Sequence, residues 1–169
     1  VKKMASAVKS TLGPHGNTVL IESPHHTHGI TVTKDGVTVA KSIELMDPVE
    51  NLAVKMMKEA SDRTATTAGD GTTTAIVLTE AMVLGGMELI KPEHNRTQVL
   101  RHMTEISDLV VERLKKKSKK VTTGMLADVA TISANNDKTI GKIIADVYKD
   151  VGKTGIVTVE KSQSTSTYA

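Results

Sequence analysis

Apolar residues recur at helical spacing over several stretches of the chain. Between residues 48 and 64 they follow an i, i+3, i+4, i+7 pattern, and Asp47 precedes Pro48 as an N-cap before a proline at the first helical position. The same periodicity predicts one long helix over residues 97–117. A break is expected at residues 85–95, which contain two adjacent glycines and a proline. Shorter helices are expected at 3–12, 75–84, 124–133 and 137–151.

Alternating apolar residues predict a small β element near the N-terminus. Strands are expected at residues 17–22 and 30–33, followed by a turn at 34–36. Residues 37–39 continue the alternation, and the pattern fits either a helix or another strand. Residues 155–160 are also expected to form a strand, although no pairing partner lies nearby in the sequence. The predicted fold class is therefore mainly α with a small β element.

Composition excludes several classes of function. Cysteine is absent, which rules out disulfides and thiolate chemistry, and the net charge of +3 is too small to favour a nucleic-acid partner. No apolar run approaches the roughly 18–20 residues of a membrane span, and the N-terminus is amphipathic, so a cytoplasmic location without a membrane partner is expected. His25 and His28 lack a third metal ligand, and Lys115–Lys120 lack aromatic neighbours, so both are interpreted as solvated segments.

The run Gly69-Asp70-Gly71-Thr72-Thr73-Thr74 carries the strongest chemical signal. Its glycines allow a positive φ and the close approach of a ligand, and its threonines open a helix whose free N–H groups favour phosphate. Asp70 is a hard oxygen ligand suited to Mg²⁺. Taken alone, the run fits equally well a helix that its threonines merely cap.

Two further glycine turns lie upstream. Residues 11–16 read Thr-Leu-Gly-Pro-His-Gly, a rigid loop with little side-chain bulk that suits contact with a nucleotide, although a plain turn explains it as well. In the second turn, Asp35 precedes Gly36 and is a candidate base or metal-positioning carboxylate. Asp-Gly is also a common hairpin turn, and both interpretations stay open.

In this combination and order, the three segments resemble chaperonins of the GroEL type. The runs that carry the resemblance are Thr11–Pro14, Thr31–Val37, Ala68–Ala75, Thr131–Asn135 and Val151–Glu160. Together they extend over nearly the whole chain. The Gly-Asp-Gly-Thr-Thr-Thr segment is shared with group II chaperonins, whereas the Thr-Ile-Ser-Ala-Asn and Lys-Asp-Gly-Val segments resemble group I.

The resemblance implies roles for both upstream turns. It implies contacts to the nucleotide phosphates and base side from Thr11, Leu12, Gly13 and Pro14. It implies a phosphate-facing turn made of Lys34, Asp35 and Gly36. Asp35 then corresponds to the catalytic carboxylate near the γ-phosphate, and the backbone carbonyls of Thr11 and Lys34 correspond to those that help hold a K⁺ ion.

The glycine–threonine run corresponds to the metal and phosphate site of the family. Asp70 matches the Mg²⁺ ligand. The matching phosphate cradle consists of Gly71, Thr72, Thr73 and Thr74. The implied cofactors are therefore ATP, Mg²⁺ and K⁺, in agreement with the chemistry inferred from the same residues.

Three segments depart from the family pattern. His15 and Asn17 stand where the family usually has Lys and Arg, so nucleotide affinity or allosteric coupling is expected to differ. The loop Pro24–His28 is longer than in typical relatives, and Pro92–Arg96 replaces a Gly-Met-Asn-Pro pattern near the contact between rings. These departures fit a divergent, virus-encoded chaperonin.

The resemblance also implies an organisation into domains and an assembly. Residues 1–116 correspond to part of the ATP-binding equatorial domain and 117–169 to the start of the intermediate domain. The family's apical domain, which binds unfolded clients and a co-chaperonin, is expected outside these residues, so the 169 residues alone are not expected to be a competent ATPase. The implied function is an ATP-dependent protein-folding subunit in a ring of identical subunits, seven in number as in group I relatives. The alternative is a non-enzymatic nucleotide-binding or assembly module.

Overall fold

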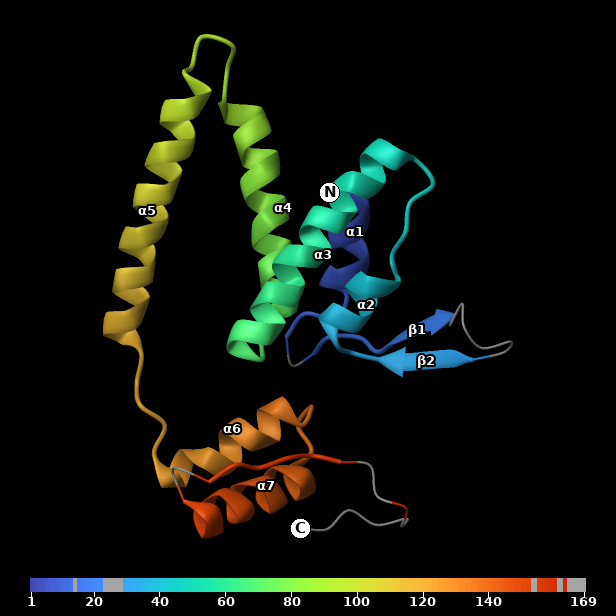
Figure 1. Ribbon diagram of the computed structural model, residues 1–169, viewed down its shortest axis with the longest axis vertical. Helices are drawn as coiled ribbons and strands as arrows, with labels where there is room; N and C mark the ends of the chain where they lie inside the picture. The colour runs from blue at the N-terminus through green and yellow to red at the C-terminus, as the bar shows by residue number, and fades with distance from the viewer. Residues whose placement is uncertain (14, 23–28, 153–154, 161–162, 164–169) are drawn as a thin grey trace. The chain divides into compact units, whose positions relative to one another are not determined.

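The fold consists mostly of helices, with one pair of short strands (Figure 1). The computed structural model describes residues 1–13, 15–22, 29–152, 155–160 and 163. The predicted class, mainly α with a small β element, is confirmed. None of the helices in these ranges is long and apolar enough to cross a membrane.

The chain divides into two compact units, Val1–Val99 and Leu100–Ala169. Within each unit, the residues contact one another more than they contact the other unit. The assignment of residues 1–116 to an equatorial domain and of 117–169 to an intermediate domain stays a prediction.

The first unit is built around a small core of aliphatic side chains. Its helices are α1 (Lys2–Lys9), α2 (Gly36–Ser42), α3 (Pro48–Ala68) and α4 (Thr72–Leu89). Helix α4 packs against α1, α2 and α3, and α1 also packs against α2. The side chains that meet in this core without solvent exposure are Met4, Ala5, Val8, Val54 and Ile76. Because Met4 and Val8 are four residues apart, they lie on the same face of α1.

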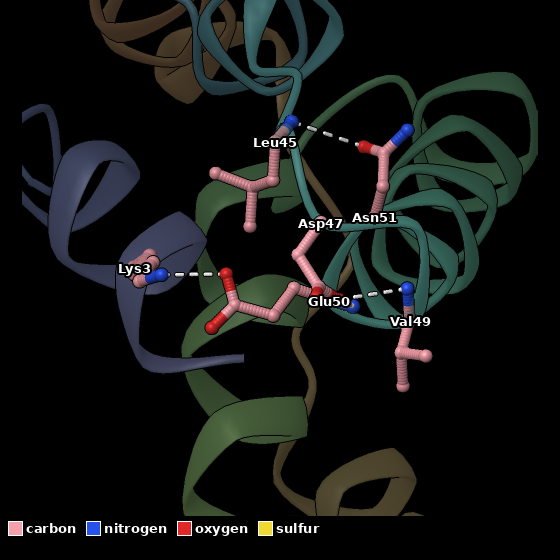
Figure 2. A network of polar contacts seen from close by, with 6 residues as sticks. All are labelled: Lys3, Leu45, Asp47, Val49, Glu50 and Asn51. Carbon is pink, nitrogen blue, oxygen red and sulfur yellow. Dashed lines mark hydrogen bonds and ion pairs between the residues drawn. The ribbon is translucent and has the colours of Figure 1, made fainter.

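Helix α3 begins where the sequence predicts. The Asp47 carboxylate accepts hydrogen bonds from the N–H groups of Val49 (2.9 Å) and Glu50 (2.8 Å) (Figure 2). Pro48 occupies the first turn. The same turn is tied to α1 by an ion pair of 2.5 Å between Lys3 and Glu50. The predicted N-cap is therefore confirmed.

The β element is an antiparallel pair formed by β1 (Val19–Glu22) and β2 (Ile30–Thr33). Leu20 lies opposite Val32, and both side chains are exposed. Ile21 belongs to the other face of β1 and packs against the core. One face of β1 thus contributes Val19 and Ile21 to the core of the first unit, while Leu20 and Val32 are exposed on the opposite face of the hairpin.

Helix α4 is longer than the sequence predicts. The break expected within residues 85–95 occurs at 90–95, and the helix, expected to end near Leu84, runs through Gly85 and Gly86 to Leu89. Two glycines cost a helix about 2 kcal/mol relative to alanine, which lowers the propensity of this end of α4 without ending the helix. The helix ends before Pro92, so proline is the breaker that acts here.

The strand predicted at 155–160 is absent, because these residues have no regular secondary structure. A strand gains its hydrogen bonds from a partner, and no strand in the described ranges pairs with this segment. Other sequence predictions lie outside the described residues, namely those for Pro14, for the loop with His25 and His28, and for the tail from Lys161 except Gln163.

The second unit contains a packed pair of helices. Helix α5 (Arg96–Lys117), predicted as one long helix, crosses from the first unit into the second. After a short 3₁₀ turn, η1 (Thr123–Met125), the helices α6 (Leu126–Ser133) and α7 (Lys138–Val151) pack against each other. Both had been predicted.

Candidate functional site

The start of α4 has the backbone conformation that its glycines allow. Gly69 and Gly71 have φ angles of 73° and 86°, a region that favours glycine. The helix begins at Thr72, directly after this bend, and Gly71 occupies the N-cap position without a side-chain hydrogen bond. Among the described residues, no side chain accepts from the N–H groups of Thr72–Thr74. The threonines therefore do not cap this helix, and its first turn offers free donors.

The three glycine segments meet at this helix start. The hydroxyl oxygens of Thr11 and Thr73 lie 3.4 Å apart, although 62 residues separate them. Gly36 is buried against the same threonine, since a Cβ atom added to it would lie 2.0 Å from Thr73 Oγ1. Three turns that are distant in the sequence thus converge on the first turn of α4.

Local hydrogen bonds fix the first loop. Thr11 is buried, and its hydroxyl donates to the Val8 carbonyl at 2.8 Å. Gly16 closes the turn by donating to the Gly13 carbonyl at 3.0 Å, and a Cβ at Gly16 would lie 2.3 Å from the Thr11 carbonyl oxygen. Leu12 and Gly13 are exposed, so this part of the predicted nucleotide loop is accessible.

Asp35 begins a helix and does not form a hairpin turn. Its Oδ2 accepts from the N–H (2.8 Å) and the hydroxyl (2.6 Å) of Thr38, which makes Asp35 the N-cap of α2. Within the described part of the chain, its Oδ1 makes no hydrogen bond. Asp35 is exposed and the preceding Lys34 is partly exposed. The cap fixes the orientation of the carboxylate and leaves one oxygen available for a ligand.

Thr38 is the residue of this region that sequence reasoning missed. Its signal was present, because a hydroxyl residue three positions after an aspartate is well placed to hydrogen-bond the carboxylate at a helix start. Because the alternation of residues 37–39 fits either a helix or a strand, the sequence alone did not identify a helix start that Asp35 and Thr38 could cap.

Asp70 lies in the bend between α3 and α4. It is exposed, and its Oδ1 accepts from the N–H of Gly71 at 2.6 Å. The described residues contain no group of three or more histidine, cysteine or acidic side chains placed to hold a metal ion by themselves. A cation bound at Asp70 would therefore take most of its oxygen ligands from a bound phosphate and water, which is how Mg²⁺ is usually held at phosphates.

Comparison with known proteins assigns the chain to a family. Residues 4–169 match the model of the TCP-1/cpn60 chaperonin family, and the chain belongs to this family. The resemblance to group I chaperonins inferred from the sequence is thereby confirmed.

Two solved structures of one phage protein are similar to this chain. Both are crystal structures of the chaperonin gp146 from the bacteriophage EL 2 (Pseudomonas aeruginosa), determined in the presence of ATP-BeFx. Form II has a TM-score of 0.76 at 30% identity, and form I has 0.74 at 32%. In both cases the match covers 88% of this chain and 26% of gp146, so the chain spans about a quarter of that relative's length.

Proposed function

We propose that the chain is part of an ATP-dependent chaperonin subunit whose nucleotide site lies at the start of α4. The observation that carries the proposal is the meeting of Thr11, Gly36 and Thr73. Each belongs to a segment that the family resemblance assigns to nucleotide binding. They meet at a helix N-terminus, where free N–H groups favour phosphate.

The roles in this site follow from the chemistry of each group. The N–H groups of Thr72–Thr74 bind phosphate oxygens together with the backbone of Gly71. Asp70 holds Mg²⁺, which neutralises part of the triphosphate charge. The backbone carbonyls of Thr11 and Lys34 hold K⁺. Asp35, oriented by Thr38, acts on the hydrolytic step through its available oxygen.

The similarity to gp146 supports a nucleotide ligand, because that chaperonin was crystallised in the presence of ATP-BeFx. By the same family relationship, we propose that these residues belong to a longer chaperonin subunit, called the full-length parent below. We propose that this parent assembles into a ring of seven identical subunits in the cytoplasm. Its apical domain would bind unfolded clients and a co-chaperonin. ATP hydrolysis would then drive the movement of the domains.

Nucleotide titration of the purified full-length parent tests the proposal. We expect saturable ATP binding that needs Mg²⁺, steady-state release of phosphate, and particles of ring size and seven-fold symmetry by electron microscopy. Binding without hydrolysis would favour the alternative, a non-enzymatic nucleotide-binding or assembly module. A parent that bound no nucleotide at millimolar ATP and Mg²⁺ would contradict the proposed site.

A further inference from the structure

An ion pair joins α1 to α4 close to the proposed nucleotide site. Lys9, the last residue of α1, pairs with Glu80, in the third turn of α4. The Glu80 side chain is only 10% exposed, whereas that of Lys9 is 46% exposed. Glu80 is the one charged residue of the stretch Ala75–Met82.

One of the facing threonines follows the first of these helices, and the other lies in the first turn of the second. Lys9 stands two residues before Thr11, and its own carbonyl accepts from the N–H of Leu12 at 3.1 Å. Glu80 stands seven residues after Thr73 on the helix whose first turn holds that threonine. The ion pair therefore fixes the end of α1 beside α4, at the point where the first loop leaves the helix.

Stability alone is a weak reason for such a pair. A carboxylate that water reaches poorly loses hydration free energy, and the attraction to its partner roughly offsets this loss. Buried ion pairs therefore add little net stability, and they are better suited to fixing one arrangement of the chain. The apolar residues Met4 and Val8 already hold α1 in the core without solvent exposure. Apolar contacts are non-directional, whereas an ion pair joins two particular residues and so specifies which part of α1 lies beside which part of α4.

We propose that the Lys9–Glu80 ion pair is a positioning device for nucleotide binding. It holds the Thr11 loop at the distance from Thr73 that the phosphates and the cation require. Lys9 and Glu80 act through the loop and through α4 and are not themselves ligands. The proposal rests on the proposed function, because it assumes that the start of α4 binds ATP.

The chain offers a matched control on the same helix. Lys3 at the other end of α1 pairs with Glu50 on α3, and both side chains are more exposed, at 64% and 44% (Figure 2). Lys3 lies two turns away from the loop. Breaking this pair removes an α1 ion pair without releasing the loop.

The test measures the Kd for Mg-ATP and the thermal midpoint in the full-length parent. Glu80→Gln and Lys9→Met are each expected to weaken ATP binding about tenfold, which is about 1.4 kcal/mol of binding free energy. The charge-swapped variant Lys9→Glu with Glu80→Lys should recover most of the affinity. Glu50→Gln should leave the Kd within about twofold of the wild type.

Each outcome decides a different point. If Glu80→Gln and Lys9→Met lower the thermal midpoint but bind ATP as the wild type does, the pair is structural only and this proposal is wrong. The same conclusion follows if Glu50→Gln weakens binding as much as Glu80→Gln does. A wild-type parent that bound no ATP would overturn the proposed function, and this inference with it. If Lys9→Met does not fold, because it leaves the buried Glu80 carboxylate without a partner, Glu80→Gln decides, since the one charge that it leaves unpaired is that of the half-exposed Lys9.

Discussion

Gly36 leaves no room for a side chain beside Thr73. A Cβ atom at Gly36 would lie 2.0 Å from Thr73 Oγ1 and 3.1 Å from both its Cβ and its backbone nitrogen. A new rotamer could move the hydroxyl, but the Cβ and the nitrogen belong to the start of α4. Glycine is thus required at this position by the close approach of two segments, and its φ angle is not in the positive range.

The first prediction is that Gly36→Ala shifts the start of α4 and impairs nucleotide binding. Overpacking of this kind typically costs about 1–3 kcal/mol of stability. We expect the Kd for Mg-ATP in the full-length parent to rise at least about tenfold, as measured by isothermal titration calorimetry. Gly85→Ala is the control, because nothing lies within 4 Å of its Cβ position and alanine favours a helix. Unchanged ATP affinity in Gly36→Ala would show that this contact does not shape the site.

A second prediction separates the two roles of Asp35. Asparagine caps helices as well as aspartate does, whereas alanine costs about 1 kcal/mol at this position. Asp35→Asn should therefore keep α2 and ATP binding while slowing hydrolysis about a hundredfold, which steady-state phosphate release would measure. Asp35→Ala should show the same loss of rate together with a lower thermal midpoint. If Asp35→Asn hydrolysed ATP at the wild-type rate, Asp35 would be a helix cap and not a catalytic residue.

The third prediction concerns the metal. Asp70→Ala should abolish Mg²⁺-dependent ATP binding or turnover, with a rate lower by roughly a hundredfold or more, because Asp70 is the one carboxylate in its loop. A Mg²⁺ titration of ATP hydrolysis by the full-length parent measures this. Asp47→Ala removes a carboxylate that caps α3 and should reduce stability without changing the response to Mg²⁺. Turnover by Asp70→Ala within about threefold of the wild type would contradict the metal role.

Sequence patterns predicted the parts of this fold that depend only on residues adjacent in the sequence. The cap of α3 by Asp47 and the positive φ angles of Gly69 and Gly71 follow from local chemistry. The exact end of α4 was less predictable, because the segment holds two glycines and a proline, and the helix passes the glycines and ends before the proline. Residues 155–160 have strand propensity, but no strand in the described ranges pairs with them, so they do not form a strand.

The candidate site was only partly accessible to sequence reasoning. The identity of its segments came from motifs and from the family resemblance. Their meeting could not be derived, because the contact between Thr11 and Thr73 spans 62 residues and depends on how α1 packs against α4. The Lys9–Glu80 ion pair could not be predicted for the same reason, because the sequence does not show that these two charges lie side by side.

A fourth prediction tests the packing of the second unit. A Cβ atom at Gly141 of α7 would lie 2.2 Å from Thr131 Oγ1 and 2.7 Å from the backbone of the same residue in α6. Gly141→Ala should therefore separate the two helices and cost about 1–3 kcal/mol, seen as faster amide hydrogen exchange in α6 and α7. Gly124→Ala, where nothing lies within 4 Å, should leave exchange in both helices unchanged. Equal protection in Gly141→Ala and the wild type would mean that the helices do not approach this closely.

The last prediction concerns a buried hydroxyl in α3. Ser61 is 1% exposed, and its Oγ has no hydrogen-bond partner among the described residues. A buried hydroxyl without a partner costs about 1–3 kcal/mol, and alanine is also the better helix former. Ser61→Ala should therefore raise the free energy of unfolding by about 1 kcal/mol, after the loss of packing around the missing oxygen is deducted. Ser61→Val is the matched variant, because it also removes the hydroxyl but adds bulk in a tightly packed position and should destabilise. Thermal midpoints of the two variants and the wild type measure the effect, and a lower midpoint for Ser61→Ala would show that the hydroxyl is satisfied in the folded protein.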